Sequence, residues 1–253
     1  MKTLYFTLSF ALYSLLSFSQ GVINTEKLIG ESDNRFQLIF SPTLDFQKGN
    51  SDITEFTYSF TSLYKLTSRH WIKATGGSDI IKESGDDITN DNFFQIRHTF
   101  GLNNWSHTFA FFQSQNSFNL KIKQRQLIGG GVRFKLKKSE KFKFDIVIGV
   151  MNEKEEYNDA NYEKQDKIRA TTMIVAKMNL FNIDFKNITY YQPNLQTLSD
   201  YRVFSEFDMG FEINEWLGYE INYIVRYDNN PPDFLENNID HYITSGFNIK
   251  IIR

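Results

Sequence analysis

Residues 201–227 read YRVFSEFDMGFEINEWLGYEINYIVRY, and this stretch decides the fold. Apolar residues take nearly every second position on both sides of a short turn that begins at Ile213. Because successive side chains of a strand point to opposite faces, the stretch predicts two antiparallel strands, each with an apolar and a polar face. The apolar faces carry Tyr201, Val203, Phe207, Met209 and Phe211 in the first strand and Leu217, Tyr219, Ile221, Tyr223, Val225 and Tyr227 in the second.

The same alternation recurs along most of the chain, for example where Phe142, Phe144 and Ile146 are separated by Lys143 and Asp145. We therefore predict an all-β protein of about twelve strands, most of which reach the ~9–11 residues of a tilted membrane-spanning strand. The predicted strands are 35–46, 53–66, 69–77, 92–102, 105–113, 118–136, 141–151, 167–178, 182–191, 200–212, 216–227 and 240–252.

The predicted connections differ in length according to the strand that they follow. Those after even-numbered strands are short, at 67–68, 103–104, 137–140, 179–181 and 214–215. Those after odd-numbered strands are mostly longer, at 47–52, 78–91, 114–117, 152–166, 192–199 and 228–239. This alternation is typical of an antiparallel up-and-down transmembrane β-barrel, with short turns in the periplasm and long loops outside, whereas a soluble sandwich has no reason to segregate loop lengths.

The N-terminus has the pattern of a secretory signal. Lys2 precedes an apolar run from Leu4 to Leu16, and Ser17-Phe18-Ser19 forms a small-x-small cleavage site, so residues 1–19 are predicted to be a signal peptide rather than a helix of the mature protein. Residues 20–34 are predicted to form an N-terminal periplasmic segment, and residues 35–253 an outer-membrane β-barrel domain. The predicted location is the outer membrane of a Gram-negative bacterium.

The amino-acid composition excludes several classes of function. The chain has 253 residues, no cysteine, a formal net charge of −2, 25 Phe and 13 Tyr. The lack of cysteine excludes disulfides, thiol catalysis and thiolate metal sites, and the near-neutral charge does not indicate nucleic-acid binding. We expect no cofactor. The expected partners are outer-membrane lipids, with small solutes or ions as further candidates, and the oligomeric state is left open.

Short segments near the C-terminal end carry a family resemblance. They are Tyr191-Gln192-Pro193, Ser199-Asp200-Tyr201-Arg202 and Arg226-Tyr227-Asp228-Asn229-Asn230-Pro231-Pro232. Together with the segment from Arg125 to Arg133, they resemble the uncharacterised family of salt-induced outer-membrane proteins. The resemblance implies an outer-membrane β-barrel without an established activity.

Five basic residues share one predicted face of the strand at 118–136 and are the candidate functional residues: Lys121, Lys123, Arg125, Arg133 and Lys135. One interpretation is an electropositive stripe that lines the lumen. The other is a solvated strand face that extends past the bilayer. The intervening run Gly129-Gly130-Gly131 lacks the strand–loop–helix context of a phosphate-binding loop, so we expect a bulge or kink there.

No metal site is predicted. The four histidines, His70, His98, His107 and His241, are scattered and lack ligand spacing. Six acidic residues could bind cations in a surface loop, but no EF-hand pattern appears, and a solvated loop is the expectation. They are Glu153, Glu155, Glu156, Asp159, Glu163 and Asp166.

Tryptophan placement gives partial support for a barrel. Trp71, Trp105 and Trp216 each lie near a predicted short turn, where an aromatic girdle is expected. Trp105 shares its predicted apolar, outward face with Phe109 and Phe111, as a girdle residue should.

The expected protein is not an enzyme but a narrow channel or a structural or envelope-stress component. An outer-membrane lipid hydrolase is one alternative. Its Ser and His should lie two residues apart on one strand face, but Ser68 precedes His70 in a predicted turn, and Ser106 and His107 point to opposite sides. A second alternative is a secreted soluble β-barrel that binds a small apolar ligand, which requires apolar faces to point inward.

The charge of the lumen is a further expectation. When the polar face of each strand is assigned inward, basic residues outnumber acidic ones, and the acidic residues should pair with basic neighbours across strands. We therefore expect a net positive interior. It would make either a narrow, mildly anion-preferring conduit or a plugged barrel without conductance.

Overall fold

The structure, a computed structural model, describes residues 35–49, 52–118, 120–139, 141–159, 162, 164–181, 183–214, 217–233 and 237–249. The predicted signal peptide at 1–19 and the predicted periplasmic segment at 20–34 lie outside the described residues. In the described part of the chain, no helix is long and apolar enough to cross a membrane.

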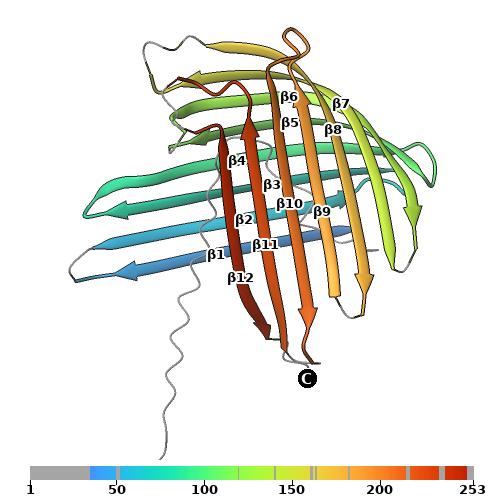
Figure 1. Ribbon diagram of the computed structural model, residues 1–253, viewed down its shortest axis with the longest axis horizontal. Helices are drawn as coiled ribbons and strands as arrows, with labels where there is room; N and C mark the ends of the chain where they lie inside the picture. The colour runs from blue at the N-terminus through green and yellow to red at the C-terminus, as the bar shows by residue number, and fades with distance from the viewer. Residues whose placement is uncertain are drawn as a thin grey trace, which may run out of the picture.

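The described residues form one sheet of 12 antiparallel strands that pair in sequence order (Figure 1). The strands are β1 (Phe36–Gln47), β2 (Ile53–Lys65), β3 (His70–Glu83), β4 (Asp86–Gly101), β5 (Ser106–Ser117), β6 (Ile122–Lys138), β7 (Phe142–Tyr157), β8 (Gln165–Leu180), β9 (Ile183–Pro193), β10 (Tyr201–Glu212), β11 (Leu217–Asp228) and β12 (Ile239–Ile249). The predicted all-β, up-and-down fold is confirmed, and each predicted strand overlaps the observed strand of the same number.

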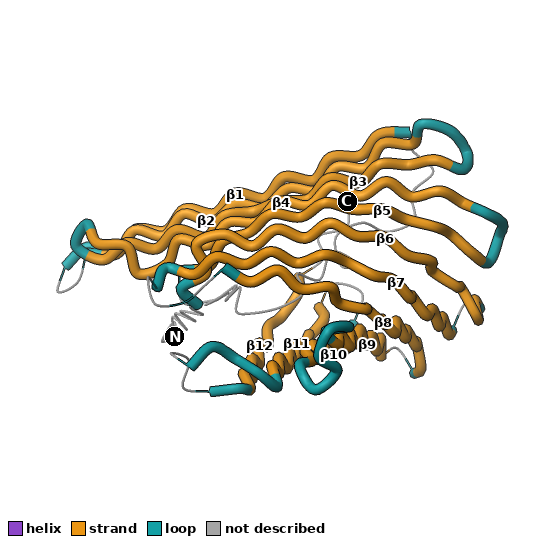
Figure 2. Tube along the Cα trace, turned by 90° about the horizontal axis from the view of Figure 1, so that it is seen from above, coloured by secondary structure: helices purple, strands orange, loops and turns teal. Residues whose placement is uncertain are grey.

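The sheet curls around a concave inner side. In Figure 1, β1 to β4 run across the view and β9 to β12 stand nearly upright, and Figure 2 shows β9 to β12 beneath β1 to β6. Strands that are not neighbours in the sheet meet on the inner side, since Arg202 of β10 donates a hydrogen bond to Glu153 of β7. β1 and β12 are the two ends of the strand order, and no pairing between them occurs among the described residues.

The connections after odd-numbered strands lie at one edge, here called the loop rim, and those after even-numbered strands lie at the other, the turn rim. Two of the predicted long loops are wrong. Residues 78–91 are mostly the ends of β3 and β4, which meet at the turn Ser84–Gly85. The predicted loop at 152–166 is also too long, because β7 extends to Tyr157 and β8 begins at Gln165. Their polar side chains suggested loops, but many of them are bonded to partners on the inner face. The longer connections are therefore confined to 158–164, 194–200 and 229–238.

The outer face is apolar, as the alternation predicts. Ile148 and Val150 of β7 are 54% and 49% exposed, whereas Val147 and Met151 on the opposite face of that strand are buried. Other strands also expose large apolar residues on this face, among them Phe56, Ile128, Ile168, Ile174, Ile243 and Phe247. The end strand β1 is exposed on both faces, since Leu38 and Phe40 are 58% and 59% exposed and Ile39 between them is 51% exposed. A secreted soluble barrel with inward apolar faces does not have this arrangement.

The prediction that Phe109 and Phe111 of β5 point outward is wrong. The guanidinium of Arg97 lies 5.2 Å from the ring centroid of Phe109, and Phe109 packs against buried residues of the inner face. Phe111 stacks on Phe109 with 6.3 Å between ring centroids. Both faces of this strand carry phenylalanine, since Phe112 is exposed on the other side. Alternation alone therefore could not assign it.

The tryptophans do not form one girdle. Trp105 is 54% exposed and stacks on Phe134, with 5.8 Å between ring centroids. The ring of Trp71 instead contacts that of His107, which is nearly buried, with 5.3 Å between centroids. Trp216 lies outside the described residues.

The glycine run of β6 forms a regular ladder, and the predicted bulge does not occur there. The register shifts of β6 lie near its two ends, between Ile122 and Gln124 and between Lys135 and Lys137. A Cβ atom on Gly131 would lie 2.3 Å from the carbonyl oxygen of Ile148. The lack of a side chain therefore lets β6 and β7 approach each other closely.

A side chain at Gly131 should destabilise the sheet. We expect Gly131→Ala to lower the free energy of unfolding by about 1–3 kcal/mol, because overpacking forces strands apart. Gly210→Ala is the matched control, since the nearest atom to its Cβ is Cβ of Asp184 at 3.8 Å. Urea unfolding in detergent, followed by tryptophan fluorescence, measures both. Equal stability of the two variants would contradict the close approach.

Candidate functional site

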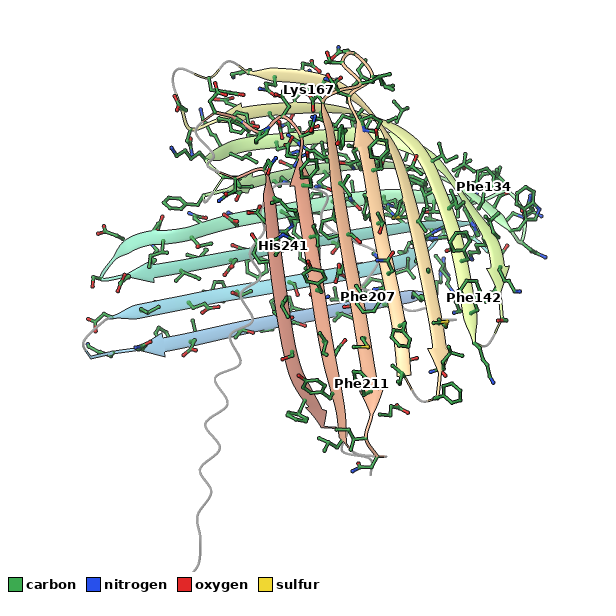
Figure 3. All side chains as sticks on the ribbon, viewed as in Figure 1. Phe134, Phe142, Lys167, Phe207, Phe211 and His241 are labelled. Carbon is green, nitrogen blue, oxygen red and sulfur yellow. The ribbon has the colours of Figure 1, made fainter. Side chains whose placement is uncertain are left out.

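A cluster of buried ion pairs lies on the inner face at the loop rim and is here called the rim network. The first residues of β6, β8 and β10 and the last residues of β7 and β11 build it, because antiparallel order brings these strand ends to the same rim. Figure 3 labels one member, Lys167, at this rim and Phe211 at the opposite end of the upright strands. The basic members are Arg125, Lys167, Arg169 and Arg202, and the acidic members are Glu153, Glu155, Asp200 and Asp228.

Glu153 is the centre of the rim network. Its side chain is 1% exposed and forms ion pairs with Arg125, Arg169 and Arg202. These arginines belong to β6, β8 and β10, so one carboxylate of β7 connects three other strands. Two of those strands are direct neighbours of β7, whereas β10 is reached only across the inner side.

Glu155 extends the same contacts by one position on the inner face. It lies 3.0 Å from Nε of Arg125 and 3.2 Å from Nη2 of Arg202. The Tyr157 hydroxyl donates a hydrogen bond of 3.0 Å to it. Arg202 also donates from Nε to Asp228 at 2.7 Å, so this arginine joins β7 to β11.

Asp200 closes the network from the connection before β10. It accepts a hydrogen bond of 2.9 Å from Nη2 of Arg169, and its other oxygen lies 2.9 Å from Nζ of Lys167. Burial by itself raises the pKa of Asp200. The hydrogen bond from Lys167 and the positive charge of Arg169 outweigh burial, so the pKa of this carboxyl lies below its usual value.

The charges of the rim network balance, with four basic and four acidic side chains. Balance matters because an ionised group removed from water costs several kcal/mol unless it is paired and hydrogen-bonded. The network has no nucleophile next to a base. Its geometry supports holding strands together and excluding water.

An apolar cluster follows the network along the inner face. Its buried members are Val147, Met173, Val175, Ile188, Tyr190 and Phe204, with Phe109 and Ile224 packed against them. These residues belong to strands from β5 to β11, and Ile188 is fully buried. Closer to the turn rim, ion pairs return, as between Arg133 and Asp145 at 3.3 Å. The inner face is therefore layered: charged, apolar and charged again.

The inner face of β2 to β5 is polar and also closely packed. Thr61 and Thr75 share a hydrogen bond of 3.0 Å. Gln95 donates to Gln113 at 2.7 Å, and Gln113 donates to Gln115 at 2.6 Å. All five side chains are buried. These residues form a wall of uncharged hydrogen-bonding groups on the inner face.

Two buried carboxylates lie on the same wall. Asp79 of β3 and Asp91 of β4 are Cα partners in the register and are 5% and 1% exposed. Thr57 donates to Asp79 at 2.9 Å, and the Ser117 hydroxyl donates to Asp91 at 3.0 Å. Hydroxyl donors thus hold these acids, which belong to strands although the sequence analysis placed them in a loop at 78–91.

The five predicted basic residues do not share one environment. Arg125 is buried in the rim network. Arg133 pairs with Asp145 nearer the turn rim, and Lys135 is the register partner of the same aspartate. These three residues lie along the inner face of β6, separated by the glycine run.

The other two members of the predicted stripe lie outside this inner row. Lys123 is 60% exposed and binds Glu156 at 2.6 Å. Lys121 is exposed in the turn before β6, with a φ of 53°. The register shift between Ile122 and Gln124 is the physical reason, because an extra residue at a bulge reverses the alternation beyond it.

Sequence reasoning missed the acidic half of the site. Glu153 and Glu155 were expected in a solvated loop, but they are strand residues with 1% and 2% exposure. A signal was present, because Met151, Glu153, Glu155 and Tyr157 continue the two-residue period of β7. These acids also remove the expected excess of positive charge from this level of the inner face.

The histidines are only partly brought together. Nδ1 of His70 lies 3.3 Å from Nε2 of His98, and His241 contacts the Tyr223 hydroxyl at 2.9 Å. No group of three or more potential metal-ligating side chains occurs among the described residues. The absence of a metal from this protein remains a prediction.

Removing the central carboxylate should destabilise the fold. We expect Glu153→Gln to lower the free energy of unfolding by about 3–5 kcal/mol, because buried arginines then lose their main counter-charge. Glu83→Gln, at an exposed site at the end of β3, is the control and should change stability by less than about 0.5 kcal/mol. Urea unfolding in detergent measures both. A similar loss in the two variants would show that the network is not stabilising.

Acid should weaken the contribution of Asp200. Because its folded-state pKa is lowered, the ionised carboxylate stabilises the fold above its ordinary pKa of about 4, and this stability is lost as pH falls through the folded value. Asp200→Asn should therefore be less stable than wild type at pH 7, and the difference should shrink below about pH 4. Unfolding curves at several pH values test this. A difference independent of pH would contradict it.

Comparison with known proteins places the chain in a family. Residues 43–251 match the family described as "Protein of unknown function, DUF481". The solved structure titled "NanC porin structure in rhombohedral crystal form" has a TM-score of 0.48 and 10% sequence identity to this chain, and the match covers 85% of this chain and 99% of that one. No curated protein matches the sequence. Because the family match covers nearly all the described strands, the chain belongs to the DUF481 family of proteins of unknown function.

Proposed function

We propose that the protein is a non-enzymatic outer-membrane β-barrel of a Gram-negative bacterium, closed by its own inner side chains, that serves as a structural component of the envelope. The observation that carries this proposal is the inverted distribution of side chains. Large apolar residues are exposed on the outer face, and charged residues such as Arg125, Glu153 and Arg169 are buried on the inner face. This distribution suits a sheet whose outer solvent is lipid.

Aromatic residues on the outer face support the proposed membrane span. Tyr201 of β10 contacts Tyr191 and Tyr227 at the loop rim, with 5.7 and 5.8 Å between ring centroids. At the turn rim, Phe211 of the same strand contacts Tyr219 at 6.4 Å. From Tyr201 to Phe211 the strand rises by ~33 Å, or ~25 Å along the membrane normal at a typical tilt. That height equals the apolar band of an outer-membrane barrel.

The packed inner face supports a barrel whose lumen is filled by side chains. The rim network and the apolar cluster together join β5 to β11 across the inner side. A conducting path would have to separate ion pairs that exclude water. The proposed resting state therefore passes no bulky solute.

A narrow conduit for small solutes or ions is the second candidate. It is favoured by the hydrogen-bonded wall of Thr61, Thr75, Gln95, Gln113 and Gln115, where polar groups instead of apolar side chains face inward. The balanced rim network gives no reason for the anion preference expected from the sequence. A conduit along this wall would be only weakly selective.

The alternative of an outer-membrane lipid hydrolase receives less support from the described contacts. The Ser106 hydroxyl donates to Oδ1 of Asn103 at 3.0 Å, and the ring of His107 contacts Trp71. His70 contacts His98 on a different strand. We therefore retain the proposal that the protein is not an enzyme. Expression that rises with salt, which the family resemblance suggests, is part of the proposal and can be followed by immunoblot at graded NaCl concentrations.

Cell fractionation and electrical recording test the proposed function together. The protein should be recovered in the outer-membrane fraction and should migrate faster on gels when unheated than when boiled. In planar bilayers it should be silent or show only a small conductance without strong ion selectivity. Recovery as a soluble periplasmic protein would overturn the membrane assignment, and a large stable conductance would overturn the closed barrel.

A further inference from the structure

A polar depression on the outer face lies directly beyond the apolar band of β6 to β8. It has a volume of about 340 Å³ and is lined by Gln124, Gln126, Lys154, Glu155, Glu156, Lys164, Gln165 and Asp166. Lys123 also reaches it, because its ammonium binds Glu156 at 2.6 Å. We propose that this depression binds the anionic, phosphate-bearing sugar headgroup of an outer-leaflet glycolipid of the lipopolysaccharide class. The inference rests on the proposed outer-membrane location.

Strand register sets the height of the depression. Ile128, Asn152 and Ile168 are register partners and form the last row with apolar residues on the outer face. The next outward row toward the loop rim is Gln126, Lys154 and Asp166, all three of which line the depression. A molecule held here would have its headgroup one row above the apolar boundary.

The wall below the depression fits acyl chains. Ile128 and Ile168 are 61% and 42% exposed. Ile148, Val150 and Ile174 continue the exposed apolar surface toward the turn rim. The chemical order along β6 to β8 is therefore polar depression, then apolar wall, which is the order of a glycolipid headgroup and its chains.

The charge of the depression favours an anion. Lys123 and Lys164 pair with Glu156, and Lys154 pairs with Asp166. The Glu155 carboxylate pairs instead with Arg125 of the rim network. Two ammonium groups, those of Lys123 and Lys164, share the single carboxylate of Glu156, at 2.6 and 2.7 Å. With Lys123 included and Glu155 paired to the arginines of the rim network, three ammonium groups face two carboxylates, an excess of one positive charge.

The ion pair between Lys154 and Asp166 does not prevent binding. Nζ of Lys154 lies 3.8 Å from Asp166, and both side chains are about 60% exposed, at 62% and 60%. An exposed pair at this distance contributes little stability, so a phosphate can displace it at small cost. The amides of Gln124, Gln126 and Gln165 can bond sugar hydroxyls at the same site.

The test compares Lys154→Ala/Lys164→Ala with the matched control Lys137→Ala/Lys141→Ala, whose exposed lysines lie at the turn rim. Each protein is folded in detergent and titrated with lipopolysaccharide, with inorganic pyrophosphate and, in nanodiscs, with phosphatidylglycerol. We expect lipopolysaccharide to bind wild type and control alike, and to bind the double variant about thirtyfold more weakly, from the loss of two near-surface cations. Pyrophosphate and phosphatidylglycerol should bind much more weakly than lipopolysaccharide.

Other outcomes overturn the inference. Equal lipopolysaccharide affinity of the double variant and wild type would remove the depression as the site. Pyrophosphate binding as tight as that of lipopolysaccharide would indicate a site for free anions, and equal binding of phosphatidylglycerol would indicate any acidic lipid. If the alanine variant does not fold, Lys154→Gln/Lys164→Gln replaces it in the titrations. If the protein is heat-modifiable and located in the outer membrane but does not bind lipopolysaccharide, this inference alone is refuted. If the protein is soluble, the proposed function is refuted as well.

Discussion

One buried carboxylate, that of Glu153, is the contact on which the loop rim depends. Hydrogen bonds between strands connect only neighbours, so they do not by themselves fix how far a sheet curls. Glu153 binds arginines from β6, β8 and β10, and Arg202 carries the connection onward to Asp228 of β11. Ion pairs among buried groups tolerate little displacement, because each separated charge would be left without water. The network therefore holds its strands at one curvature, and the apolar cluster beneath it packs residues of β5 and of β7 to β11 together.

The two faces of the sheet follow from one solvent argument. In a soluble barrel the apolar face points inward and charges point to water. Here Ile148 and Ile243 are among the most exposed apolar side chains, while Arg169 is fully buried. The proposed lipid on the outside would account for the exposed isoleucines, because apolar side chains are favoured in an apolar solvent. The inner charges pair with one another because they are buried away from bulk water. The proposed membrane location and the proposed filled interior thus rest on the same distribution of side chains.

Local sequence pattern was sufficient for the strands but not for the network. A two-residue period is a property of neighbouring residues, so all twelve strands could be placed from it. The partners of Glu153 are a long-range property, since Arg202 lies 49 residues away along the chain. The acidic residues at the end of β7 resemble a loop in composition, and only their two-residue period indicated a strand. Lys123 shows a second limit, because a bulge reverses alternation without leaving a mark in the sequence. Phe109 shows a third, because a strand with phenylalanine on both faces has no apolar side to choose.

The segments that carry the family resemblance meet at the rim network. Gln192, Asp200 and Arg202 come from two of them, Asp228 comes from the third, and Arg125 begins the fourth. Arg169 joins the first two, since it donates to the backbone oxygen of Gln192 at 3.2 Å and to Asp200 at 2.9 Å. Each motif residue in this group is used to pair a charge or to bind a backbone atom, and none is placed to attack a substrate. The motifs on which the family resemblance rests therefore correspond to the contacts that hold the loop rim together. These contacts are the reason why we propose a structural role for the protein before a reaction.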